Sequence, residues 1–256
     1  MRSLNLANLL EDAPRHLATF REWTAPLSKA AKGIRLSEMF FLYATVADLA
    51  PTRILESGRA RAQSTLVLSA LFPQARIVSL ESDPASPDVA HAAERLRDRL
   101  NVECRFGDSR LLLPELAQNG DIILIDGPKD FRAVKLALKL LQSGKPAAVF
   151  VHDLWRGVPA RDFVDRHLPS VFLSDATAWV RSYADLDSAR RAPPLADDEP
   201  IVYGATLGCF PAGQEDYTAS LRQCERAQAA DRVRATFGKL WKQQPVDRPP
   251  DFSIVL

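Results

Sequence analysis

The chain has 256 residues, 46% of them hydrophobic and 25% charged, which is the composition of an ordinary soluble globular protein with a sizeable core. Its 33 Lys and Arg residues are balanced by 32 Asp and Glu residues, and no block of like charges stands out. Such a chain has no long-range field to recruit nucleic acid or an anionic membrane surface, so we expect neither as a partner.

The three cysteines, Cys104, Cys209 and Cys224, are odd in number and far apart in the sequence. This pattern fits free thiols in a reducing compartment better than a disulfide framework or a zinc site. The first residues lack the apolar segment of a signal peptide, and the longest apolar runs are too short to cross a bilayer. A cytoplasmic protein is therefore expected.

Helical patterns occupy residues 4–20 and 35–49, and we expect residues 1–50 to form a helical segment that packs on the core. From residue 54 onward, short apolar runs alternate with helical periodicity five times. The predicted strands are 54–55, 76–80, 102–106, 121–125 and 147–151. Helices are predicted between them, and the second of these has Val89, Leu96 and Leu100 as its buried stripe.

The remaining part of the chain is less regular. Residues 171–183 and 201–210 are predicted to form two further strands, and 214–242 an amphipathic helix before a Pro-rich tail. We therefore expect one domain, with an α/β core at 51–212 and a C-terminal helix and tail at 213–256.

Five strand–helix units in succession predict a doubly wound, mostly parallel sheet of seven strands, with helices on both faces. Ligands of such sheets bind beyond the carboxyl ends of the strands. The residues that directly follow each predicted strand are therefore the candidates for chemistry.

The first strand runs into Glu56-Ser57-Gly58-Arg59-Ala60-Arg61-Ala62, ahead of Ser64 and Thr65. A turn that lets backbone amides approach a ligand needs residues with little or no Cβ bulk, which Gly58, Ala60 and Ala62 supply. The start of the following helix favours an anionic group. An ordinary tight turn without a ligand is the alternative interpretation.

Glu81 and Ser82 follow the second strand, and an acid at this place is suited to accept hydrogen bonds from the hydroxyls of a ribose. Gly107-Asp108-Ser109 follows the third strand, where it is suited to flank an adenine. The fourth strand ends in Asp126-Gly127-Pro128-Lys129, and the fifth in His152-Asp153. Each group alone is explicable as a cap or a surface charge, whereas polar residues after all five strands favour a binding site.

These motifs resemble class I S-adenosylmethionine-dependent methyltransferases, over roughly residues 35–155. Within that class the chain is most similar to the catechol-type small-molecule O-methyltransferases. The acid-bearing first loop, the Gly-Asp before Leu113-Pro114-Glu115-Leu116, and Asp126-x-x-Lys129-Asp130 have counterparts there. The resemblance implies a Rossmann-like methyltransferase fold and a cofactor site. The expected cofactor-binding residues are Glu56, Gly58, Ala60, Ser64, Glu81, Ser82, Asp108, Ser109 and Asp126.

By the same resemblance, His152, Lys129 and Asp153 are the expected catalytic residues, with Lys129 at the position of the general base. Asp126, His152 and Asp153 occupy three metal-ligand positions, where the family usually carries Asp-Asn after its fifth strand. The imidazole shifts the preference of such a site from magnesium toward manganese, iron or zinc. A metal-free site with His152 as general base is the alternative, because an imidazole with an ordinary pKa accepts a proton near neutral pH.

The sequence therefore predicts an enzyme that transfers a methyl group from S-adenosylmethionine to a hydroxyl of a small molecule or sugar. Because Arg59 and Arg61 add bulk and charge to the first loop, the alternative is a binding or scaffold module with an altered or lost cofactor site. A nicotinamide oxidoreductase is a weaker alternative, since the chain lacks G-x-G-x-x-G at this loop. A small-molecule acceptor is the expected partner; a homodimer is compatible with the sequence, which does not decide the oligomeric state.

Overall fold

The computed structural model describes residues 3–28, 33–187, 206–213 and 215–242, with the side chains of 237–242 excepted. Its centre is a seven-stranded sheet in the order β3-β2-β1-β4-β5-β7-β6. The strands are β1 (Arg53–Ser57), β2 (Arg76–Glu81), β3 (Val102–Phe106), β4 (Ile122–Ile125), β5 (Ala148–Val151), β6 (Phe172–Leu173) and β7 (Gly208–Pro211). The first five pair in parallel, and β7 is antiparallel to both of its neighbours. The predicted mostly parallel seven-stranded sheet is thus confirmed.

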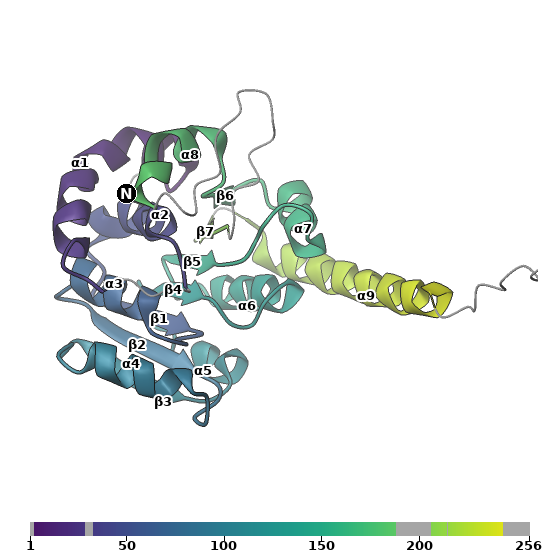
Figure 1. The fold of residues 1–256 in the computed structure, drawn as a ribbon. Coiled ribbons are helices and arrows are strands. Elements are labelled where there is room, and N and C mark those ends of the chain that lie inside the picture. Colours follow the sequence, from purple (N-terminus) through teal and green to yellow (C-terminus); the bar gives the residue numbers. More distant parts are fainter. Residues whose placement is uncertain (1–2, 29–32, 188–205, 214, 243–256) are drawn as a thin grey trace, which may run out of the picture.

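Helices cover both faces of this sheet (Figure 1). They are α1 (Leu6–Thr24), α2 (Leu36–Val46), α3 (Gln63–Leu71), α4 (Asp88–Leu96), α5 (Ser109–Leu116), α6 (Phe131–Gln142), α7 (Pro159–His167), α8 (Thr177–Tyr183) and α9 (Tyr217–Lys242), with short 3₁₀ turns η1 (Ala47–Leu49) and η2 (Ala184–Leu186). Helices α1 to α4 and α8 pack on one face, and α5, α6, α7 and α9 contribute to the core on the other.

Because successive side chains of a strand point to opposite faces of the sheet, one strand contributes to both cores. Ile54 of β1 belongs to the core under α1 to α4, and the adjacent Leu55 belongs to the opposite core. Every residue of β4 and β5 is buried, as expected for central strands covered on both faces. None of the helices in the described ranges is long and apolar enough to span a membrane.

The predicted strand 171–183 is wrong over most of its length. Only Phe172 and Leu173 pair with β7, and residues 177–183 form helix α8. Trp179, Val180 and Tyr183 are buried there, with the i, i+1, i+4 spacing of one helix face. Aromatic and β-branched residues in a short segment favour strand and helix alike, and the packing of Trp179 against α2 decides for helix.

The stripe predicted for the second core helix is wrong at its last position. Leu96 is buried, but α4 ends there, and Leu100 is fully exposed in the turn that leads to β3. Part of the predicted strand 201–210 is found as β7. Residues 201–205 and the predicted tail 243–256 lie outside the described residues.

Candidate functional site

The strand order reverses between β1 and β4, which are neighbours in the sheet although β2 and β3 lie between them in the chain. The turn after β1 and the turn after β4 meet there. A Cβ built on Gly58 would lie 2.8 Å from the carbonyl carbon of Asp126 and 2.9 Å from the nitrogen of Gly127. Only glycine allows this approach, and Gly58 has a φ of +86° as well. The switch point, where ligands of doubly wound sheets bind, is therefore built on Gly58.

Two alanines of the first loop have the left-handed backbone conformation that usually favours glycine. Ala60 and Ala62 have positive φ values, 42° and 59°, in the left-handed region. Alanine in this region costs about 1–2 kcal/mol. Ala62 directly precedes α3, and no side chain caps that helix start. The two alanines therefore hold the backbone in a region that glycine adopts without strain.

Glu56 lies beneath the loop with no exposed surface, at the end of β1. Its carboxylate accepts hydrogen bonds from Thr65 Oγ1 at 2.5 Å, from Ser79 Oγ at 2.6 Å and from the hydroxyl of Ser64. Burial raises the pKa of Glu56, and the three hydroxyl donors offset part of that rise. Glu56 therefore connects the end of β1 to the start of α3 and to β2.

A cavity of about 320 Å³ lies beside this loop, at the carboxyl ends of β1 to β4. This volume is in the range of small-molecule sites. It is lined by Gly58, Leu80, Ser82, Gly107, Asp108, Ser109, Arg110, Gly127, Pro128 and Arg132. Four of the predicted cofactor residues, Gly58, Ser82, Asp108 and Ser109, thus border one cavity.

Glu81 lies at the end of β2 and connects two of the turns. Its Oε2 accepts from the amide of Ala60 at 3.0 Å, and its Oε1 accepts from the amide of Ser82 at 2.8 Å. Asp108 caps α5 and pairs with Arg110 at 2.5 Å on the exposed side. Since exposed ion pairs contribute little, a ligand can replace Arg110 at this carboxylate.

A smaller cavity of about 150 Å³ adjoins on the other side of Gly58, at the start of α3. Ala60, Ser64 and Asp126 line it, together with Arg59 and Arg61. Seven of the nine predicted cofactor residues therefore border two cavities that share Gly58, whereas Glu56 and Glu81 line neither cavity.

Neither arginine of the loop lines the larger cavity. Arg59 is buried and donates from Nη1 to the carbonyls of Ser79 and Arg105, with its guanidinium 5.0 Å from the ring centre of Phe106. Arg61 pairs with Asp88 at 2.6 Å. Their charged ends are held by the sheet and by α4, so the larger cavity stays open beside them.

Charged side chains gather after β4 and β5, next to the smaller cavity. Lys129 Nζ lies 2.5 Å from Asp126 Oδ1 and also pairs with Asp153. His152 Nδ1 lies 2.7 Å from the same Asp126 oxygen and 3.5 Å from Asp153 Oδ1. We call Asp126, Lys129, His152 and Asp153, together with Glu38 of α2, the charged cluster. The structure brings together all three predicted catalytic residues.

The two basic groups of the charged cluster, Lys129 and His152, hold their protons tightly. Burial alone would lower the pKa of His152, but the charge of Glu38 and hydrogen bonds to Asp126 and Glu38 raise it to about 10. Burial likewise opposes the rise in the pKa of Lys129, which the Asp126 and Asp153 carboxylates produce. The pKa of Asp126 is lowered because His152 and Lys129 outweigh its burial. The expectation that His152 has an ordinary imidazole pKa is therefore wrong, and His152 is an imidazolium at neutral pH in this arrangement.

The ligand atoms of Asp126, His152 and Asp153 lie within 4.8 Å of one another. Two ligands of one divalent ion, each about 2.1 Å from it, are separated by at most about 4.2 Å. The donor set therefore fits an ion after a small adjustment, with Lys129 leaving both carboxylates and His152 giving up its Nδ1 proton. In the arrangement described, these two cations already face the carboxylates.

Glu38 of α2 is a functional candidate that the sequence analysis missed. Its side chain has no exposed surface, and its Oε2 lies 3.4 Å from His152 Nε2. Burial raises the pKa of Glu38, although His152 acts against that rise. In the sequence Glu38 resembles an ordinary acid in the first turn of a helix. Its one distinguishing signal is its place directly before the apolar run from Met39 to Ala44.

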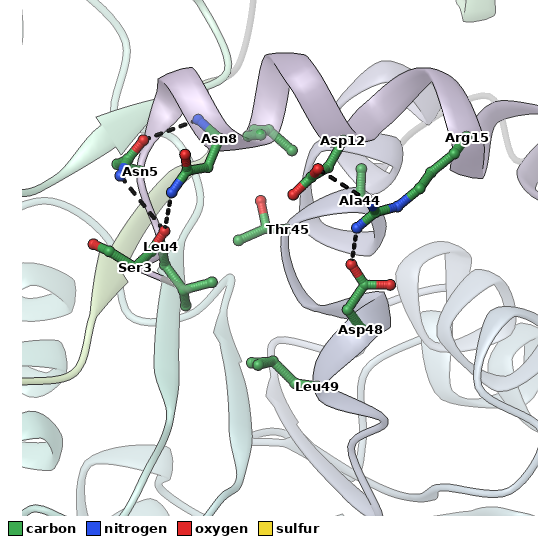
Figure 2. Close-up of a pocket in the computed structure, with 11 residues that line it drawn as sticks. Ser3, Leu4, Asn5, Asn8, Asp12, Arg15, Ala44, Thr45, Asp48 and Leu49 are labelled. Carbon is green, nitrogen blue, oxygen red and sulfur yellow. Dashed lines mark hydrogen bonds and ion pairs between the residues drawn. The ribbon is translucent and has the colours of Figure 1, made fainter. Parts of the chain in front are cut away.

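A third cavity, of about 400 Å³, lies apart from these two, between α1, α2 and η1, the turn that leads into the amino end of β1 (Figure 2). Its polar side chains are paired among themselves or with the backbone. Arg15 pairs with Asp12 and Asp48, Asn8 donates to the carbonyl of Ser3, and Thr45 donates to the carbonyl of Phe41. These partners and its place away from the carboxyl ends of the strands make it the weaker candidate.

No family model matches the sequence, and no curated protein matches it. Solved structures do match. An O-methyltransferase from Bacillus cereus in complex with SAH is 21% identical and covers 80% of this chain and 90% of its own, with a TM-score of 0.44. TomG, an O-methyltransferase from Streptomyces achromogenes in complex with SAM, is 22% identical over 80% and 89%, with a TM-score of 0.43.

An SAH-bound methyltransferase from Podospora anserina is 22% identical and covers 79% of this chain and 92% of its own, with a TM-score of 0.43. At such identities and TM-scores these likenesses assign no function to this chain.

Proposed function

We propose that the protein is an S-adenosylmethionine-dependent methyltransferase acting on a hydroxyl of a small molecule or sugar. One observation carries the proposal. Two cavities that share Gly58 at the switch point of the sheet, lined by the turns after β1 to β4, lie beside a cluster of proton-bearing side chains after β4 and β5.

The residues present fit the cofactor at the observed turns. A Cβ at position 58 would collide with the backbone of Asp126 and Gly127, so glycine lets the turns after β1 and β4 meet between the two cavities. Ser82, Asp108 and Ser109 would hold the nucleoside in the larger cavity, with Glu81 turning toward the ribose. The amino end of α3 at Ser64 would face the amino-acid part, where a carboxylate is favoured.

When bound, S-adenosylmethionine supplies a methyl group on a sulfonium, which is already electrophilic. In the transfer, an O–C bond to the acceptor forms as the C–S bond breaks, and the sulfur keeps the electron pair. The protein must align the acceptor oxygen with the methyl group and accept the proton of the hydroxyl. Alignment is worth up to about 7–11 kcal/mol in well-oriented pairs.

The charged cluster is suited to both tasks. Since Lys129 and His152 carry their protons at neutral pH, we assign them to stabilising the oxygen as it loses its proton, and not to accepting that proton. Asp153 is one-fifth exposed and is the carboxylate to which we assign the hydroxyl proton. This assignment changes the expected role of Lys129 from general base to electrostatic partner.

We also propose that the transfer needs no resident metal, because Lys129 and His152 already place positive charge against Asp126 and Asp153. If an ion were bound, Asp126, His152 and Asp153 would hold it, and it would polarise the acceptor oxygen. Activity is expected to stay within about twofold after dialysis against a chelator. A loss of tenfold or more that Mn²⁺ restores would contradict the metal-free assignment.

Transfer of a labelled methyl group from S-adenosylmethionine to a panel of phenols, catechols and sugars tests the proposed activity. Lys129→Met is expected to lower kcat by about 10²-fold while the KM for S-adenosylmethionine stays unchanged, because Lys129 lies outside both cavities. Arg166→Met, an exposed change on α7, is the matched control and is expected to leave kcat unchanged.

The alternative function, a binding or scaffold module with an altered cofactor site, was motivated by Arg59 and Arg61. Both arginines line the smaller cavity, but their charged ends are already paired, with backbone carbonyls and with Asp88, and neither lines the 320 Å³ cavity. The two hypotheses differ in the labelled assay. A protein that neither binds S-adenosylmethionine nor transfers a methyl group to any hydroxyl compound would favour the alternative.

A further inference from the structure

Glu38 is a buried carboxylate with an incomplete set of partners. Its Oε2 accepts from the amide of Arg35 at 3.1 Å and faces His152 Nε2 at 3.4 Å. Its Oε1 is buried and has no hydrogen-bond partner in the described structure. A carboxylate that only caps the start of a helix can do so from the surface, so capping does not account for the burial of Glu38.

His152 lies between two carboxylates that come from different parts of the chain. Asp126 follows β4 and faces Nδ1, whereas Glu38 comes from α2 and faces Nε2. The backbone amide of His152 donates to the carbonyl of Ile125, which fixes the main chain but not the ring. Nε2 therefore faces Glu38, whereas Nδ1 faces Asp126 and, at 3.5 Å, Asp153, and the ring can turn over only by losing these contacts.

We propose that Glu38 is a positioning residue of the transfer site: its buried carboxylate holds Nε2 of His152, so that Nδ1 is kept toward Asp126 and Asp153. As a role in catalysis this rests on the proposed function, whereas the contact itself does not. Where a carboxylate orients a metal-bound imidazole through its second nitrogen, its substitution costs about 10–100-fold in metal affinity or activity, and Glu38 has the same geometry toward an imidazole without a metal.

Asp187 also stabilises the start of α2, and its substitution therefore provides a matched control. Asp187 accepts from the amide of Ser37 at 3.1 Å and from the Ser37 hydroxyl at 2.7 Å. Asp187→Ala therefore loosens the same helix start without touching His152. Glu38→Gln keeps the size of the side chain but removes its charge at Nε2.

Nitrogen-15 NMR of the histidine rings in the full chain tests the proposal. The chain has four histidines, and His152→Asn identifies the His152 signals. In Glu38→Gln the ring protons on both Nε2 and Nδ1 are expected to exchange with solvent at least tenfold faster, although Asp126 is intact. In Asp187→Ala both are expected to keep the exchange rates of the unmodified protein.

Unchanged exchange at Nδ1 in a folded Glu38→Gln variant would overturn the proposal, and so would equal acceleration in Asp187→Ala. If Glu38→Gln does not fold, Glu38→Asp replaces it, and the same two outcomes decide. A titration with S-adenosylhomocysteine on the same samples keeps the two hypotheses apart. Absence of binding to the unmodified protein would count against the proposed function and leave the NMR result on Glu38 standing.

Discussion

At the scale of single residues, Gly58 determines whether the two turns at the switch point can meet. Gly58→Ala is expected to destabilise the fold by at least about 2 kcal/mol, from the positive φ and from the contact with the backbone of Asp126 and Gly127. Urea unfolding measures the change. Because the turns would have to separate, binding of S-adenosylhomocysteine is expected to be lost as well.

Gly120→Ala is the matched control for this prediction. Gly120 has a nearly equal φ of +83°, but a Cβ there would meet nothing within 4 Å. Only the backbone cost of about 1–2 kcal/mol is expected, with ligand binding intact. Equal losses in the two variants would show that the close approach to Asp126 and Gly127 has no energetic weight.

His152 makes the stability of the protein depend on pH. Its pKa rises from the ordinary value of 6.5 to about 10 on folding, so the folded state binds the proton more tightly than the unfolded state. The resulting stability is fully present below about pH 6.5 and is lost as the pH rises toward 10. His152→Asn, unfolded in urea across this range, should show a flatter profile. A decline as steep as in the unmodified protein would locate the titrating group elsewhere.

The residue types of the site could be predicted from the sequence, but their pairings could not. Strand ends identify Asp126, Lys129, His152 and Asp153, because parallel strands place their carboxyl ends at one edge. Glu38 comes from a helix more than a hundred positions away from His152, and no periodicity connects the two. The raised pKa of His152 depends on that contact, which is why an ordinary imidazole was expected.

At the scale of elements, α8 shows how tertiary contacts decide a segment that local pattern leaves open. Trp179 stacks on Phe40 at 5.4 Å between ring centres and meets Phe41 edge-on at 5.3 Å, so α8 braces the helix that carries Glu38. Trp179→Ala is expected to cost about 3–5 kcal/mol in thermal or urea unfolding. Trp23→Ala, at a residue that is 37% exposed, should cost about 1 kcal/mol or less.

A small effect of Trp179→Ala, equal to that of Trp23→Ala, would mean that α8 does not brace α2.

At the scale of elements, the sequence pattern predicts central strands better than edge strands. Central strands such as β4 are recognisable because they are apolar throughout, whereas the edge strand β6 has two residues and no pattern of its own. Element ends also depend on contacts, as the exposed Leu100 beyond α4 shows.

At the scale of the whole molecule, the sheet order was predictable only in part. Alternating strand and helix patterns predict a doubly wound sheet, and the reversal between β1 and β4 follows from that class. The antiparallel β7 between β5 and β6 is set by chain connections that the pattern does not contain. This arrangement leaves the carboxyl ends of β1 to β5 together at one edge, where the cavities and the charged cluster lie.

The central claim is that this edge binds S-adenosylmethionine, and isothermal titration of the full chain with S-adenosylmethionine tests it most directly. We expect one equivalent to bind with a dissociation constant in the micromolar range. Glu81→Ala is expected to weaken binding at least tenfold, and Glu115→Ala, an exposed acid on α5, to leave it unchanged. No heat of binding at millimolar ligand, or equal affinity in all three proteins, would contradict the claim.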